Sequence, residues 1–139
     1  MPRMIFINLP VRSLPAATAF YKAIGAGQNM QFSDETASCM VLSDTIFVML
    51  LTHEKFRGFA PHPVADARQH TGMLIALSAD SREEVDNLVR KAGAAGGTAD
   101  VMPAQDHGFM FQRTFADPDG HVWEIFWMDP DVVQQQPAA

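Results

Sequence analysis

The residue with the clearest potential for chemistry is Glu124, a carboxylate within the apolar segment 121–127 (HVWEIFW). If this segment is a strand, its side chains alternate between two faces, and Val122, Glu124 and Phe126 share one of them. Apolar side chains on both faces predict a strand that is buried on both sides. A glutamate in such surroundings suits a general acid or base, or a hydrogen bond to a ligand. The alternative is a structural role, in which Glu124 pairs with Arg113 or reaches solvent at the end of the strand.

The five histidines give weaker evidence for a catalytic or metal site than Glu124 does. They are His53, His62, His70, His107 and His121. None of their spacings gives the i, i+4 pair of a helical metal site or an alternating pair on one strand. Solvated loop side chains are therefore expected. Asp106 beside His107 is the one pair in which a carboxylate could orient an imidazole as a base.

Asn8 and the larger apolar side chains are candidates for a binding pocket. Asn8 shares a face with Phe6 on the first expected strand, and a buried amide there either bonds the backbone or meets a ligand. Cys39 lies in an apolar segment without a cationic neighbour, which indicates an inert buried thiol. The flexible apolar residues form either core or a pocket for an apolar or aromatic molecule; they are Met30, Met40, Met49, Met73, Met102, Met110, Phe32, Phe47, Phe109 and Phe111.

The elements that must position these residues follow from apolar runs and turn signals. Strands are predicted over 4–9, 29–32, 37–42, 45–51, 73–77, 98–102, 109–115 and 121–127. One helix starts at the cap Ser13 and ends at Gly25, and a second starts at a Ser81–Glu84 capping box and ends at Gly93. A short helical turn over 53–59 precedes a loop over 60–69, and the DPDG sequence of 117–120 predicts a tight turn.

This order repeats: strand, helix and three strands occur twice. A shift of 68 positions places Phe6 on Leu74 and Gly25 on Gly93. Residue identity across the shift is slight, so the repeat rests on the order of elements and on their turn residues.

Composition excludes several classes of protein. The chain has 139 residues, 10 Lys and Arg against 16 Asp and Glu, and a net charge of −6, which argues against a nucleic-acid partner. The longest apolar run, near 45–51, is far shorter than the ~20 residues of a membrane span, and no signal peptide is evident. A single cysteine agrees with a reducing, cytoplasmic location.

Four segments in this order carry a family resemblance: LPVRSLPAATAFYKAIG (9–25), MLIALSA (73–79), RTFADPDG (113–120) and HVWEIFW (121–127). The chain resembles the vicinal oxygen chelate superfamily, the group of glyoxalase I, bleomycin-resistance proteins and extradiol dioxygenases. More narrowly, it looks like small bacterial predicted lactoylglutathione lyases. The resemblance implies an α+β fold of two βαβββ modules whose curved, mostly antiparallel sheets surround a cavity, with the helices outside. One domain would span 1–128, with modules of about 1–59 and 70–128, and 129–139 would be a loose tail.

In metal-dependent members of that superfamily, the first and last strands of each module supply one ligand each to a divalent ion. Matching strand by strand puts Phe6, Met49 and Leu74 at three of these positions and Glu124 at the fourth. Phenylalanine and leucine donate no lone pair, and a thioether suits Zn²⁺, Ni²⁺ or Mg²⁺ poorly. We therefore expect no metal and no other cofactor.

The resemblance implies a small organic molecule in an apolar cavity. Its expected contacts are Phe6, Asn8, Phe47, Met49, Leu74, Phe111 and Arg113. Two functions fit: a metal-independent binding protein of the bleomycin-resistance kind, or a glyoxalase-like lyase or isomerase in which Glu124 is the catalytic proton shuttle. The enzyme would need a group that stabilises an enediolate charge, and the sequence offers no obvious one, so binding is favoured. A homodimer is also expected, without nucleic-acid or membrane partners.

Overall fold

A computed structural model describes residues 2–132 of the chain. The first module consists of β1 (Ile5–Val11), α1 (Leu14–Ala23), β2 (Gly27–Asn29), the 3₁₀ turn η1 (Met30–Phe32), β3 (Ala37–Val41) and β4 (Ile46–Thr52), and α2 (His53–Phe59) follows it. The second consists of β5 (Leu74–Ser78), α3 (Arg82–Ala94), β6 (Thr98–Ala99), β7 (Gln105–Asp106), β8 (Met110–Ala116) and β9 (Val122–Met128). The α+β class is confirmed, and each module begins with a strand and a helix, but the second has four strands after its helix where three were predicted.

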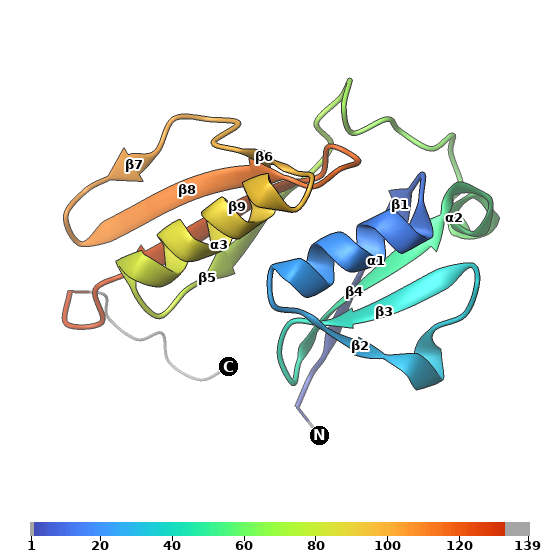
Figure 1. Cartoon of the computed structure of the whole chain (residues 1–139), viewed down its shortest axis with the longest axis horizontal. Helices are drawn as coiled ribbons and strands as arrows, with labels where there is room; N and C mark the ends of the chain where they lie inside the picture. Colours follow the sequence, from blue (N-terminus) through green and yellow to red (C-terminus); the bar gives the residue numbers. More distant parts are fainter. Residues whose placement is uncertain (1, 133–139) are drawn as a thin grey trace.

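Each module builds its own sheet. The strand orders are β1-β4-β3-β2 and β5-β9-β8-β6, with β7 also paired to β8. In both sheets the first strand runs parallel to the last, and the remaining pairs are antiparallel. Figure 1 shows the two modules side by side, with α1 and α3 on the same side of their sheets. The first strand of each module is therefore an edge strand.

Both long helices start as their sequences predict, with one difference. The Ser13 hydroxyl accepts a hydrogen bond from the Ala16 amide (3.2 Å), and the Ser81 hydroxyl accepts one from the Glu84 amide (3.0 Å). The predicted capping box would return the Glu84 carboxylate to the Ser81 amide, but that carboxylate instead accepts from the amide of Asp80. The free donors at the start of α3 are thus satisfied one residue further out than expected.

The core is shared between the modules. Helix α1 buries Phe20 and Tyr21, and these rings contact Phe115 and Trp123 of the second sheet (centroid distances 5.9 Å for Phe20–Phe115 and 6.0 Å for Tyr21–Trp123). Helix α3 adds Val85, Val89 and Ala92, all fully buried. One continuous core therefore fixes the relative position of the two sheets. We call the other side of each sheet, turned away from α1 and α3, its open face.

The predicted turn at 117–120 connects β8 to β9, and its Asp117 takes part in hydrogen bonds between the two modules. The Tyr21 hydroxyl donates to Oδ2 of Asp117 (2.7 Å), and the indole N–H of Trp123 donates to the same hydroxyl (3.0 Å). Oδ1 of Asp117 accepts from the amides of Asp119 and His121 (2.9 Å each). Burial raises the pKa of Asp117, and burial followed by the nearby Asp117 charge raises that of Tyr21.

Three parts of the strand prediction were wrong. Strand β2 ends at Asn29, whose side chain accepts from the Gln31 amide (3.0 Å), so residues 30–32 form a 3₁₀ turn. Strand β6 has only two residues because Asp100 adopts a left-handed conformation (φ 54°). The short strand β7 was not predicted at all. The expected tail over 129–139 begins with a turn at Asp129, and its residues 133–139 lie outside the described part.

Candidate functional site

The strand register relates the candidate residues of the two modules. In the first sheet Asn8 of β1 lies beside Met49 of β4, and in the second sheet Ala76 of β5 lies beside Glu124 of β9. Phe6 and Leu74 each lie two residues earlier on their strands. Because both pairs of strands are parallel, Met49 and Glu124 occupy equivalent places in the two modules.

These equivalent places do not provide the ligands of a hard divalent ion. The ring of Phe6 stacks on that of Phe47 (centroids 4.6 Å apart, 11° between planes), and Leu74 is an exposed hydrophobic side chain beside Val122. Glu124 is the one oxygen donor of the four positions. Within residues 2–132, moreover, no three His, Cys, Asp or Glu side chains converge. The donor set does not fit the metal site of the metal-dependent superfamily members.

Glu124 lies half-buried on the open face of the second sheet, opposite Thr114 of β8. Its carboxylate accepts a long hydrogen bond from the Gln112 side-chain amide (3.4 Å). Gln112 was absent from the predicted site. The sequence contains the signal nevertheless: strands joined by the 117–120 turn are antiparallel, so Gln112 and Thr114 share the face of Glu124 by alternation.

Arg113 and Phe111 were expected in the site, but they lie on the opposite face of β8. Their partners across the register are Ile125 and Trp127, which face the helix side. Arg113 therefore makes no pair with Glu124. Its guanidinium instead binds the carboxylates of Asp100 (2.7 Å) and Asp86 (2.8 Å). The hydrogen bond from Arg113 holds the pKa of Asp100 below its usual range.

Phe111 likewise has a partner on the helix side. The Arg82 guanidinium lies over the rings of Phe111 (5.1 Å to the centroid) and Trp127 (5.2 Å). Its two terminal nitrogens bind Asp106 at 3.0 and 2.8 Å. This hydrogen bonding lowers the pKa of Asp106. The carboxylate thus binds Arg82, which removes the support for an Asp106–His107 catalytic pair.

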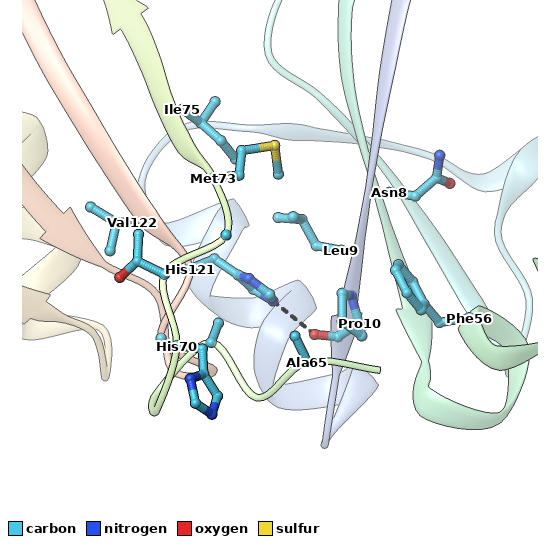
Figure 2. A pocket seen from close by; sticks show the side chains of 14 residues that line it. Asn8, Leu9, Pro10, Phe56, Ala65, His70, Met73, Ile75, His121 and Val122 are labelled. Carbon is cyan, nitrogen blue, oxygen red and sulfur yellow. Dashed lines mark hydrogen bonds between the residues drawn. The ribbon is translucent and has the colours of Figure 1, made fainter. Parts of the chain in front are cut away.

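A pocket of about 160 Å³, which we call the seam pocket, lies between β1 and β5. It is lined by Asn8, Leu9, Pro10, Phe56, Ala65, Ala67, His70, Thr71, Gly72, Met73, Ile75, Gly120, His121 and Val122. Figure 2 shows Leu9 and Met73 facing this space and His121 reaching across to β1, where its ring bonds the Pro10 carbonyl oxygen (2.8 Å). The walls are mostly apolar. A cavity of about 150 Å³ is enough to hold benzene, so this pocket admits a small molecule or one ring of a larger one.

An open groove of about 760 Å³ continues from the seam pocket along β1. Asn8, Phe56 and Met73 line both, and the groove adds Phe6 and Phe59, which is 71% exposed. The structure thus brings Phe6 and Asn8 to one apolar site, beside Phe47 and Met49 in the register. Glu124 does not line the seam pocket; it lies two residues along β9 from Val122, which does.

The loop over 60–73 covers the seam pocket, and Gly120 permits its close approach. Gly120 has φ 91°, and a Cβ there would lie 2.8 Å from the backbone of Ala67 and Arg68. The Asp66 carboxylate also lies 3.4 Å from the Arg12 guanidinium. The loop is therefore held against both modules.

Two open sheets of this topology, packed side by side through their helix-covered faces, define a class of paired βαβββ proteins. The match to the family model of the Glyoxalase/Bleomycin resistance protein/Dioxygenase superfamily extends over residues 3–125. The chain belongs to this superfamily. A comparison with curated proteins gave no significant match.

Solved structures agree with the fold. Hypothetical protein SA1046 from S. aureus is 26% identical over 91% of this chain and 95% of its own, with a TM-score of 0.75. A glyoxalase/bleomycin resistance protein/dioxygenase family enzyme from Burkholderia phytofirmans PsJN is 20% identical over 91% and 99%, with a TM-score of 0.73. The fosfomycin resistance protein FosX from Listeria monocytogenes is 22% identical over 94% and 97%, with a TM-score of 0.66.

Proposed function

We propose that this protein binds a small organic molecule in the seam pocket and the adjoining β1 groove, without a metal ion. The observation that carries the proposal is the continuity of these two hollows around Asn8. Mostly apolar walls with a few polar groups are typical of small-molecule sites. The side chains at the four superfamily ligand positions support metal-independent binding, since Glu124 alone suits a hard ion.

The lining indicates the chemistry of the ligand. The stacked Phe6 and Phe47 rings and Met73 offer a surface for a flat apolar body. Asn8 lines both hollows, and its amide can donate or accept a hydrogen bond. We therefore propose an aromatic or otherwise flat ligand of modest size with at least one polar group.

A homodimer is part of this proposal. Exposed apolar side chains gather on and before the edge strands β1 and β5, and they are Met4, Ile5, Phe6, Met73 and Leu74. Such clusters on edge strands commonly mark an interface. We expect light scattering to give the mass of a dimer at micromolar concentration, and a monomer would contradict this part of the proposal.

No helix in residues 2–132 is long and apolar enough to cross a membrane.

One observation favours a lyase or isomerase as the second candidate. The Gln112 amide is an N–H donor next to Glu124 on the open face, and enediolate chemistry needs both a base and a donor for the developing oxyanion. In this reading Glu124 moves the proton at a carbon beside a carbonyl. The amide is now bonded to Glu124 itself, so it would have to reorient toward substrate. We rank binding first for this reason.

Native mass spectrometry of the purified protein, together with elemental analysis, tests the proposal directly. The expected result is a co-purifying organic molecule with no stoichiometric transition metal. The amide signals of Asn8 and Met73 should shift when the identified molecule is added back to stripped protein. A stoichiometric metal, or shifts confined to residues remote from β1, would contradict it.

An activity assay separates the two candidates. Methylglyoxal–glutathione hemithioacetal is offered to the wild type, to Glu124→Gln and to the control Glu83→Gln, each with and without Ni²⁺ or Zn²⁺. Turnover that survives in Glu83→Gln and disappears in Glu124→Gln would establish the enzyme. Turnover that is equal in all three proteins would remove Glu124 from the mechanism.

A further inference from the structure

A second hollow lies between the modules, among the side chains of the helix-covered side. We call it the helix-side cleft; its volume is about 340 Å³, within the ~300–1,000 Å³ range of small-molecule sites. Its lining residues are Tyr21, Ile24, Gly25, Ala26, Leu42, Ser43, Ile46, Leu77, Ser78, Glu84, Leu88, Phe115 and Trp123. Both modules contribute walls, so a molecule bound here would contact the two halves of the chain at once.

The cleft has an aromatic floor and apolar sides. Tyr21, Phe115 and Trp123 are each at most 1% exposed, and the Tyr21 hydroxyl is already bonded to Asp117 and Trp123. Ile24 from the end of α1 and Leu88 from α3 pack against this core. Aromatic rings of this kind attract apolar groups and, through their faces, cations.

Glu84 is the one charged residue among those that line the cleft. Its position is fixed because one carboxylate oxygen accepts from the Asp80 amide while its own amide donates to Ser81. A carboxylate has about four acceptor positions, so this arrangement leaves room for a donor from a ligand. Within residues 2–132 the lining contains no lysine or arginine, and a ligand that brings its own positive charge would meet an opposite charge here.

The helix-side cleft is separate from the seam pocket. The two share no lining residue, and they meet opposite ends of β5: Met73 and Ile75 line the seam pocket, whereas Leu77 and Ser78 line the cleft. The charge pattern also differs, because the seam pocket has two histidines and no carboxylate in its lining. A ligand suited to one hollow is therefore not the ligand suited to the other.

We infer that the helix-side cleft is a second ligand site, which takes a compact apolar or aromatic molecule with a protonated amine. The apolar body lies among the side chains of Ile24, Leu77 and Leu88, and the ammonium group binds the Glu84 carboxylate. Since the ligand contacts both modules and binds only the folded chain, its binding raises the free energy of unfolding.

The probe is 2-phenylethylammonium chloride, compared with neutral 2-phenylethanol and anionic 3-phenylpropionate. Amide shifts in ¹H–¹⁵N spectra report the location, and tryptophan fluorescence, compared between the wild type and Trp127→Phe, isolates the signal of Trp123 at the floor of the cleft. The amine should shift the signals of Gly25, Ser43 and Leu88 saturably. It should bind about tenfold more tightly than the anion, which corresponds to about 1.4 kcal/mol.

Two variants and a matched control sharpen the test. Glu84→Gln keeps a side chain suited to that helical position but removes the charge, so affinity for the amine should fall about fivefold and become equal to that for the alcohol. Glu83→Gln removes one charge next to it but from a residue outside the lining, and its affinity should stay near the wild-type value. Leu88→Phe fills the cleft and should weaken all binding, with thermal unfolding used to confirm that the variant folds.

Three outcomes would overturn the inference. The first is the absence of saturable binding up to millimolar probe. The second is an equal loss of affinity in Glu83→Gln and Glu84→Gln, which would show general attraction to an acidic surface. The third is a set of shifts at Asn8 and Met73 instead of Leu88, which would place the probe in the seam pocket and support the proposed function while removing this second site.

Discussion

The two modules share one framework but differ in the chemistry of their open faces. Both pair their first and last strands in parallel, and the register puts Met49 of the first module where Glu124 stands in the second. The first open face is therefore apolar, with stacked rings at Phe6 and Phe47, whereas the second has a carboxylate beside the Gln112 amide. The framework therefore keeps equivalent positions in the two modules while the side chains at those positions differ in chemistry.

The contacts between the modules, in contrast, include specific polar bonds beside the shared apolar core. The Tyr21–Asp117–Trp123 hydrogen bonds and the His121–Pro10 bond all cross from one module to the other. A buried network of this kind contributes most when all its members are satisfied. Variants at these contacts should therefore weaken the packing of the two modules against each other and lower the free energy of unfolding. Variants on one open face should affect one module only.

Tyr21→Phe should have the largest effect. Removing the hydroxyl leaves the buried Oδ2 of Asp117 and the Trp123 N–H without this partner, and each unsatisfied buried group costs about 1–3 kcal/mol. We expect the free energy of unfolding in urea to fall by about 2–4 kcal/mol. Thr18→Val provides the control, because its bond to Ser38 lies within the first module and is only partly buried. An equal loss in both variants would contradict a special role for the contacts between modules.

Gly120→Ala should be the next largest. The new methyl group would meet the 60–73 loop at 2.8 Å in addition to requiring a left-handed conformation. Gly108→Ala is the matched control, since Gly108 also has a positive φ (80°) but no atom within 4 Å of the added carbon. We expect Gly108→Ala to lose about 1 kcal/mol and Gly120→Ala at least about twice that, measured by thermal unfolding. If the seam pocket binds the ligand, Gly120→Ala should also weaken binding, and Gly108→Ala should not.

The buried carboxyl of Asp117 should make stability depend on pH. Burial raises its pKa in the folded chain, so between the ordinary aspartate value of 3.8 and that raised value the folded state holds more protons than the unfolded state. The free energy of unfolding therefore falls as pH rises through this window, by about 1.4 kcal/mol for each unit of the shift. Asp100 and Asp106 have lowered pKa values, and their contributions are lost only as pH falls below about 3.8.

Urea unfolding of the wild type and of Asp117→Asn from pH 4 to 8 isolates this effect. Asp117→Asn should be less stable overall, because a side-chain NH₂ group in the place of Oδ2 cannot accept the hydrogen bond that the Tyr21 hydroxyl donates. The difference between the two proteins should shrink as pH rises through the window. A difference that stays constant or grows with pH would contradict the raised pKa.

Much of the fold could be predicted because it depends on short-range signals. Caps such as Ser13, the turn at 117–120 and the apolar faces of α1 and α3 are determined by neighbours in sequence. Two of the three failures occurred where a single residue interrupts the strand. Asn29 caps its own turn, and the left-handed Asp100 interrupts the expected strand at 98–102.

The site was harder to predict because it depends on which face each strand presents and on contacts between distant segments. Asn8 was predicted to share a face with Phe6 because side chains alternate along a strand, and the register places Phe47 and Met49 beside them. Phe111 and Arg113 were chosen by residue type, but a shift of one residue along β8 exchanges its faces. The His121–Pro10 bond spans 111 positions of sequence, and no local pattern indicates it.

The smallest effect is expected at Arg113, and it tests the face assignment itself. Arg113 binds Asp86 and Asp100 in partly exposed ion pairs, and pairs of this kind contribute about 0–1 kcal/mol. Arg113→Gln should therefore lower the free energy of unfolding by at most about 1 kcal/mol and leave ligand affinity unchanged, because the side chain lies on the helix side of β8. Gln112→Ala, the neighbour on the open face, should affect stability as little but change any activity or binding that involves Glu124. Titration calorimetry with the co-purified ligand tests the assignment: if Arg113→Gln loses affinity, the assignment of faces, and with it the contrast between the two modules, is wrong.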